Sequence, residues 1–111
     1  MSASGDSTIL ARLFAIIESR KGADPSVSRT AYLFHRGIPK IAQKLGEEAV
    51  EAVIAAVQGN PRDLVNESAD LLYHLFVLWS AMGLKPGDIY AELERREGTS
   101  GIEEKRSRTR P

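Results

Sequence analysis

Apolar residues recur three and four positions apart along most of the chain, and this period predicts helices rather than strands. Pro39 suits the first turn of a long helix, and Asn60 with Pro61 is typical of an N-cap followed by the first helical residue. Residues 28–37 are expected to add a short helical turn packed on the core. The four predicted helices cover residues 8–20, 39–58, 61–82 and 89–97.

The two long predicted helices carry apolar side chains around most of their circumference, more than the short helices of one chain would cover. The turn Gly59–Asn60–Pro61 is short, so these helices are expected to run antiparallel. We therefore predict an all-α fold: a bundle of about four helices per chain, whose two long antiparallel helices form the core of a homodimer. Residues 1–97 are predicted to form this single domain, and residues 98–111 a polar, basic and mobile C-terminal tail.

Length and composition limit the number of domains, the partners and the types of metal site that the chain can have. The chain has 111 residues, which suits one domain with one core. Lys and Arg total 15, as do Asp and Glu, so net charge does not indicate nucleic acid or a membrane as a partner. The absence of cysteine excludes disulfides and thiolate metal sites. No signal peptide and no bilayer-spanning apolar run is visible, so a cytoplasmic protein is expected.

Four carboxylates share one spacing: Glu48 and Glu51 on the first long helix, and Glu67 and Asp70 on the second. Residues three apart lie on one face of a helix, so each pair points to one side. The second pair lies in an otherwise apolar stretch, where a carboxylate needs a cation or a hydrogen-bond partner. Both pairs lie at similar distances from the predicted turn, so they would face one another and hold a hard divalent metal. Oxygen ligands without thiolates favour Mg²⁺, with Mn²⁺ as a substitute.

A magnesium ion held by few carboxylates keeps positions open for water and for substrate phosphates. Positive side chains near the acids would bind the remaining phosphate charge. The pattern therefore favours metal-assisted hydrolysis of a phosphoanhydride, with Glu47 orienting the water or accepting its proton. The alternative interpretation is an ordinary solvated acidic face. The candidate phosphate-binding residues are Arg29, Arg36, Lys40 and Lys44.

Two polar residues near the second acidic pair have open assignments. His74 lies one turn beyond Asp70, and its ordinary interpretation is a core histidine whose hydrogen bonds are satisfied. In the alternative, it donates a hydrogen bond to Asp70 or Glu67 and so orients a metal ligand. Asn66 could hydrogen-bond a ligand or cap a neighbouring chain.

The residues around the acids carry a more specific pattern. The segments Lys40–Glu51 (KIAQKLGEEAVE) and Asn66–Leu75 (NESADLLYHL) resemble the all-α nucleotide pyrophosphohydrolases of the MazG-like superfamily. Within that superfamily they are most similar to the phosphoribosyl-ATP pyrophosphohydrolases of histidine biosynthesis. The resemblance extends from Thr30 through the last predicted helix. One departure is Ser28–Arg29–Thr30, where that family commonly has Ser-Tyr-Thr.

This resemblance implies a homodimeric helical bundle that hydrolyses phosphoribosyl-ATP to phosphoribosyl-AMP and pyrophosphate with magnesium. The implied roles are metal ligation by Glu48, Glu51, Glu67 and Asp70, catalysis by Glu47 and Glu48, and phosphate contact by Lys40 and Lys44.

The residues alone leave two other functions open. One is a house-cleaning nucleoside triphosphate pyrophosphatase of the dCTP or dUTP type. The other is a non-catalytic helical module for dimerisation or metal binding. The carboxylate spacing cannot separate the two hydrolases, because both cleave between the α and β phosphates. Only the flanking segments favour the first.

Overall fold

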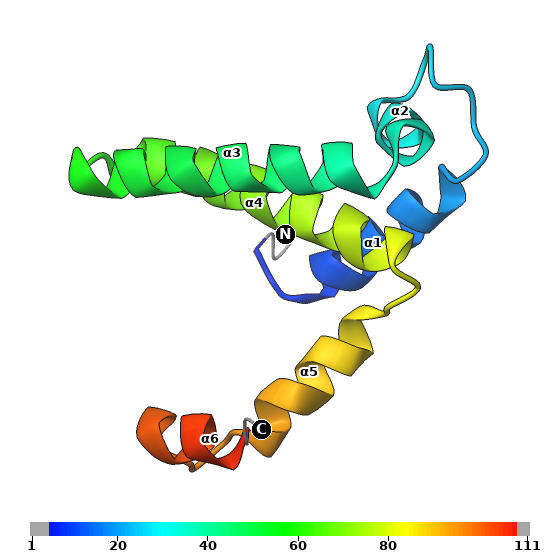
Figure 1. Cartoon of the computed structure of the whole chain (residues 1–111). Helices are drawn as coiled ribbons and strands as arrows, with labels where there is room; N and C mark the ends of the chain where they lie inside the picture. The colour runs from blue at the N-terminus through cyan, green and yellow to red at the C-terminus, as the bar shows by residue number, and fades with distance from the viewer. Residues whose placement is uncertain (1–4, 109–111) are drawn as a thin grey trace.

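The computed structural model describes residues 5–108, and every regular element in that range is a helix, which confirms the predicted all-α fold. The predicted helices correspond to α1, α3, α4 and α5, while the predicted turn at residues 28–37 is the complete helix α2 (Figure 1). The helices of the described residues are α1 (Thr8–Ser19), α2 (Arg29–Arg36), α3 (Ile38–Val57), α4 (Pro61–Ala81), α5 (Pro86–Arg95) and α6 (Gly101–Ser107).

Local sequence determines the turn between the two long helices. Gly59 adopts a φ of 68°, a left-handed conformation that favours glycine, and this ends α3. The side-chain oxygen of Asn60 accepts a hydrogen bond from the backbone N–H of Asp63 at 3.1 Å, so Asn60 caps α4 as predicted. With Pro61 at the start of α4, the chain reverses within a few residues, and α3 and α4 run antiparallel side by side.

The buried core lies at the end of the α3–α4 hairpin that is farther from its turn. There α1 packs against α4, and α2 packs against both long helices (Figure 1). The apolar core cluster consists of Ile17, Leu33, Ile41, Phe76 and Val77. Its members come from α1, α2, α3 and α4, so burial of apolar surface joins all four helices into one unit.

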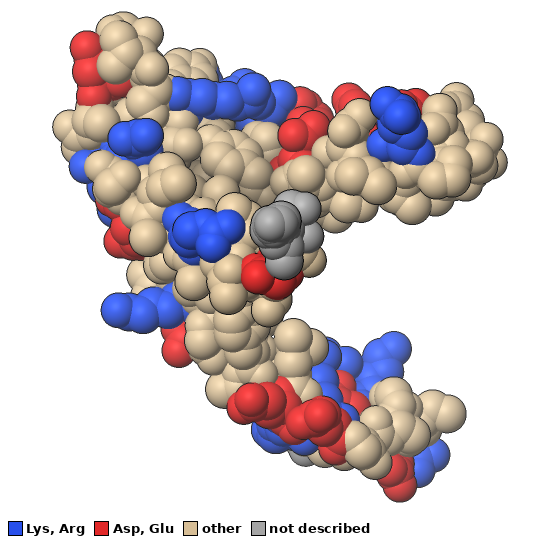
Figure 2. Space-filling model, turned by 180° about the vertical axis from the view of Figure 1, so that it is seen from behind, with Lys and Arg blue, Asp and Glu red and all other residues tan. Residues whose placement is uncertain are grey.

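The part of the hairpin nearer the turn keeps apolar side chains on its surface. Val53 and Val57 on α3 are 61% and 82% exposed, and Val65 on α4 is 69% exposed. From behind, the hairpin projects from the body and shows mainly uncharged surface (Figure 2). Several exposed apolar side chains on one hairpin are typical of an interaction surface.

Helices α5 and α6 form an arm that leads away from the bundle (Figure 1). α5 starts at Pro86, three residues earlier than predicted, and none of its residues is buried. α6 was not predicted at all. The carboxylate of Glu104, 5% exposed, binds Arg95 at 2.7 Å and Arg96 at 3.5 Å, which fastens α6 to the end of α5. It also binds Arg108 at 2.8 Å, at the end of its own helix.

The predicted division into residues 1–97 and 98–111 includes residues 1–4 and 109–111, which lie outside the described residues. The mobility predicted for the tail stays a prediction, although residues 101–107 are helical. Among the described helices, none combines the length and the apolar character that crossing a membrane requires.

Candidate active site

Three carboxylates from the two long helices come together in the hairpin. Glu48 on α3 and Glu67 and Asp70 on α4 each offer one side-chain oxygen, and these oxygens lie within 4.8 Å of one another. The spacing of three residues places Glu67 and Asp70 on one face of α4, and the antiparallel pairing puts Glu48 opposite them. Carboxylate oxygens at this separation fit a hard divalent cation such as Mg²⁺ or Mn²⁺.

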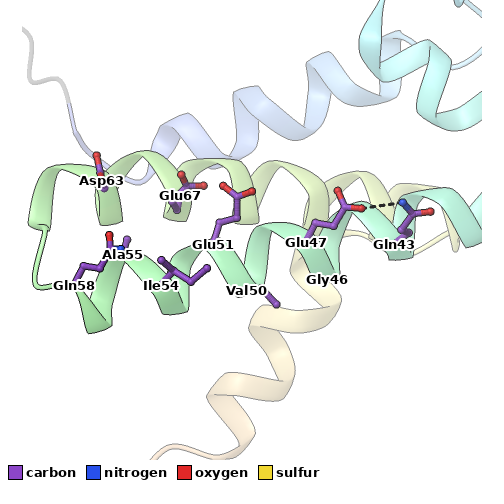
Figure 3. A pocket seen from close by; sticks show the side chains of 10 residues that line it. All are labelled: Gln43, Gly46, Glu47, Val50, Glu51, Ile54, Ala55, Gln58, Asp63 and Glu67. Carbon is purple, nitrogen blue, oxygen red and sulfur yellow. Dashed lines mark hydrogen bonds between the residues drawn. The ribbon is translucent and has the colours of Figure 1, made fainter.

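Glu51, the fourth predicted ligand, lies beside this group. It lines the same groove as Glu67, with both carboxylates on the same side (Figure 3). Burial, and then the negative charge of Glu51, raise the pKa of the Glu67 carboxyl above its usual value of 4.5. The Oε1 atom of Glu67 is buried and has no hydrogen-bond partner among the described residues. A bound cation would satisfy this oxygen and remove the repulsion, so the donor set fits a metal, while the individual ligand assignments stay predictions.

The groove itself has a volume of about 590 Å³ and runs along residues 43–58 of α3, with Asp63 and Glu67 on the α4 side (Figure 3). Val50 and Ile54 give it an apolar stretch beside the acids. Among the described residues, no lysine or arginine lines it. The groove can therefore hold a cation and apolar groups, but positive charge for a polyphosphate must come from elsewhere.

A second cavity, of about 290 Å³, opens on the other side of the acidic group. It is lined by Arg29, Glu48, Asp70, Tyr73 and His74. The guanidinium of Arg29 forms no ion pair with any described residue. This cavity therefore combines two of the clustered carboxylates with one positive charge that is free to bind a ligand.

The other three predicted phosphate-binding residues line neither cavity. Lys44 forms an ion pair with Glu47 at 3.1 Å. Arg36 donates a hydrogen bond to the hydroxyl of Tyr32 and lies over its ring. Lys40 contributes positive potential at Glu47. Of the four candidates, only Arg29 lines a cavity together with the clustered carboxylates Glu48 and Asp70. Phosphate contact by the other three stays a prediction.

Glu47, the predicted activator of water, is engaged elsewhere in this structure. Its carboxylate accepts hydrogen bonds from the amide of Gln43 at 2.9 Å and from Lys44 at 3.1 Å. The hydrogen bond from Gln43, followed by that from Lys44, lowers the pKa of Glu47 below its usual 4.5. A carboxylate with a lowered pKa is a weaker base, so these two partners make Glu47 less ready to accept a proton.

His74 is 2% exposed and occupies a fixed position. Its Nδ1 atom lies 2.8 Å from the main-chain carbonyl oxygen of Asp70, and because a carbonyl only accepts, Nδ1 carries the proton and donates. The predicted donation to a carboxylate is therefore replaced by donation to the backbone. Its Nε2 atom is buried and has no partner among the described residues. Asn66 is exposed on α4 and lines neither cavity, so its role stays open.

Three residues of the site were not predicted. Gln43 lies one helical turn before Glu47, and this spacing of four residues could have revealed its hydrogen bond. Tyr73 lines the second cavity, and its hydroxyl forms a hydrogen bond with that of Thr30, 43 positions away in the sequence. No local pattern signals this contact, because it depends on how α2 packs on α4.

A helical hairpin that carries clustered carboxylates on both helices fits the all-α pyrophosphohydrolases that the sequence resembles. Residues 10–97 match the family model of phosphoribosyl-ATP pyrophosphohydrolase. The chain therefore belongs to the phosphoribosyl-ATP pyrophosphohydrolase family, which confirms the resemblance found in the sequence.

Relatives support this membership over nearly the whole chain. A phosphoribosyl-ATP pyrophosphatase of Azospirillum brasilense is 60% identical over 100 residues, which are 90% of this chain and 90% of that protein. The protein of the same name from Paramagnetospirillum magneticum is 59% identical over 105 residues, 95% of this chain and 96% of the relative. A third, from Cereibacter sphaeroides, is 55% identical over 101 residues, 91% of this chain and 98% of the relative.

Proposed function

We propose that this chain is a hydrolase that cleaves the α–β phosphoanhydride of phosphoribosyl-ATP, giving phosphoribosyl-AMP and pyrophosphate. This reaction is the second step of histidine biosynthesis. The observation that carries the proposal is the family match over residues 10–97, together with relatives of that name at 55–60% identity. The carboxylate group in the hairpin supplies the chemistry that the reaction needs.

The proposal includes a magnesium ion, for which manganese could substitute. Glu48, Glu67 and Asp70 would hold it, while the charge of Glu51 acts on Glu67 from beside the group. When bound, the cation polarises phosphoryl oxygens and lowers the pKa of a coordinated water. The chain's own contribution is to place three carboxylates on helices and to keep two of them, Glu48 and Glu67, partly out of bulk water. Charges act more strongly where bulk water is excluded.

Residues around the cation would bind the substrate phosphates and orient the attacking water. Arg29 faces the acidic group across the second cavity and would bind substrate phosphate. Lys40 and Lys44 precede the acids on α3 and would reach phosphates when Lys44 leaves Glu47. Glu47, freed by the same movement, would orient the attacking water. In this proposal, Lys44 leaves the carboxylate of Glu47 and binds a substrate phosphate when the substrate binds.

A second copy of the chain completes the proposed molecule. The exposed apolar side chains of the hairpin would pack against the same surface of a partner in a symmetric homodimer. They include Val53, Val57, Val65 and Leu72. A cytoplasmic location and a small-molecule nucleotide substrate, without nucleic acid or a membrane as a partner, belong to the same proposal.

The test measures pyrophosphate release from phosphoribosyl-ATP and from a panel of ordinary nucleoside triphosphates, with and without magnesium. We expect fast, magnesium-dependent release from phosphoribosyl-ATP alone. Release from dCTP or dUTP instead would assign the chain to house-cleaning. No release from any substrate would favour the non-catalytic module.

The double variant Glu67→Gln, Asp70→Asn tests whether these two carboxylates bind the metal. It keeps side-chain size while it removes two negative charges from the acidic group. We expect it to fold as well as the wild type without metal and to lose activity by at least about 1,000-fold, as removal of essential charge stabilisation does. Loss of folding would show that these acids are structural.

A further inference from the structure

We infer that Arg29 binds the 5′-phosphate of the phosphoribosyl group in this chain, so that the second cavity is the phosphoribosyl subsite. Because the family commonly has tyrosine at this position, the arginine adds a charged contact to that subsite and does not define the family's substrate. The inference rests on the proposed function and extends it to the part of the substrate that ordinary nucleoside triphosphates lack.

The backbone around Arg29 is held in place while its side chain stays free. Arg29 is the first residue of α2, and the hydroxyl of Ser28 caps that helix by accepting from the N–H of Ala31 at 3.1 Å. On the other side, the hydroxyls of Thr30 and Tyr73 form a hydrogen bond that ties the first turn of α2 to α4. A guanidinium on such a fixed helical turn can bind a ligand without the loss of conformational entropy that ordering a loop requires.

Arg29 is also the only one of the four candidate cations that lines either cavity. Lys44 is paired with Glu47, and Arg36 is engaged with Tyr32. The positive charge at the acidic group therefore comes from one arginine, on the side of the smaller cavity.

The substrate has two separate anionic ends, a triphosphate and a phosphate monoester on the second ribose. A divalent cation held by the carboxylates serves the triphosphate. The monoester needs its own partner, and the planar guanidinium of arginine binds phosphate through two parallel hydrogen bonds.

The second cavity offers further groups that suit a phosphorylated sugar. The buried Nε2 of His74, on a residue that lines this cavity, is an acceptor without a donor among the described residues. Ribose hydroxyls are hydrogen-bond donors of the kind it lacks. The carboxylates of Glu48 and Asp70 in the same wall would repel a phosphate, and a cation bound to them would remove most of that repulsion.

The test combines variants of Arg29 with truncated ligands. Phosphoribosyl-AMP and AMP differ only by the phosphoribosyl group, so calorimetric binding of both, with magnesium, isolates that group. We expect Arg29→Gln to raise the dissociation constant of phosphoribosyl-AMP about 10- to 100-fold, which is the range for loss of charged hydrogen bonds. The dissociation constant of AMP should change by less than about twofold. Arg29→Lys should recover part of the loss. Arg20→Gln, which removes the same charge from the end of α1, should change neither.

Hydrolysis gives an independent measurement. The kcat/KM for phosphoribosyl-ATP should fall in Arg29→Gln by the same 10- to 100-fold and stay unchanged in Arg20→Gln. Equal losses for both ligands would overturn the inference, because Arg29 would then serve the phosphates that they share. No loss for either would overturn it as well. If the wild type itself binds and hydrolyses phosphoribosyl-ATP no better than ATP, the proposed function fails, and that result is distinct from a failure of Arg29.

Discussion

Glu51 on α3 and Glu67 on α4 point to the same side of the hairpin groove (Figure 3). Burial of Glu67, and then the charge of Glu51, raise the pKa of the Glu67 carboxyl above 4.5. The folded chain without metal therefore holds a proton on Glu67 more tightly than the unfolded chain does. This electrostatic conflict is typical of a site that is completed by a cation.

The first prediction concerns stability without metal. A carboxyl whose pKa is raised on folding contributes stability that is fully present below its unfolded pKa of 4.5 and is lost as pH rises through the higher folded pKa. We expect Glu67→Gln to raise the free energy of unfolding at pH 7, because the repulsion is gone. The gain should shrink as pH falls toward 4.5. Urea unfolding in EDTA at pH 7 and pH 5 measures this difference.

Glu94→Gln is the control for that comparison, because it removes an exposed carboxylate from α5, away from the acidic group. Its stability should follow the wild type at both pH values. Identical pH profiles for wild type and Glu67→Gln would contradict the raised pKa of Glu67.

The second prediction concerns the metal. A cation that binds only the folded state stabilises it by about 2.7 kcal/mol at a hundredfold excess over its dissociation constant. Mg²⁺ or Mn²⁺ should therefore raise the Tm of the wild type, and EDTA should reverse the rise. Glu48→Gln, which removes the α3 member of the group, should abolish most of the shift. An equal shift in both proteins would place the cation elsewhere.

Much of this fold could be predicted because its determinants are local. Apolar periodicity marks α3 and α4, and the Gly59–Asn60 turn carries its own conformational and capping signals. The acidic group followed from two pairs at a spacing of three residues and an antiparallel turn. The start of α6 has a local signal that was missed, because Ser100 and Glu103 have the spacing of a capping box and Ser100 caps the helix. The attachment of α6 to α5 through Glu104 and Arg95 depends on packing, which no local pattern signals.

The site was harder to predict where it depends on packing between helices. The sequence offered four candidate cations, and the family resemblance favoured Lys40 and Lys44 among them. Only the packing of α2 on α4 shows that Arg29 lines a cavity with Glu48 and Asp70. The engagement of Glu47 with Gln43 and Lys44 is local, at spacings of four and three, and was within reach of sequence reasoning.

The third prediction concerns the homodimer. Val53 and Val57 are 61% and 82% exposed in one copy, and each would be buried in the proposed interface. Burying a valine contributes about 1.5 kcal/mol or more, and a substitution counts twice in a symmetric dimer. The wild type should sediment as a dimer at micromolar concentration. Val53→Asp or Val57→Asp should raise the dissociation constant more than about 100-fold.

Val27→Asp is the control, because this valine is 81% exposed in the loop between α1 and α2, away from the hairpin face. It should sediment as the wild type does. A monomeric wild type would remove the homodimer from the proposal, whatever the variants do.

The fourth prediction concerns the arm. Glu104 is 5% exposed and binds Arg95 at 2.7 Å and Arg108 at 2.8 Å. Its partners are about half exposed, so solvent weakens these ion pairs, and we expect Glu104→Gln to speed hydrogen exchange in α6 about tenfold. Glu103→Gln, on the exposed side of the same helix, should change it little. Because α5 has no buried residue, the Tm of the bundle should stay the same in both variants. A fall in Tm with Glu104→Gln would mean that the arm packs on the bundle, or on a partner, in solution.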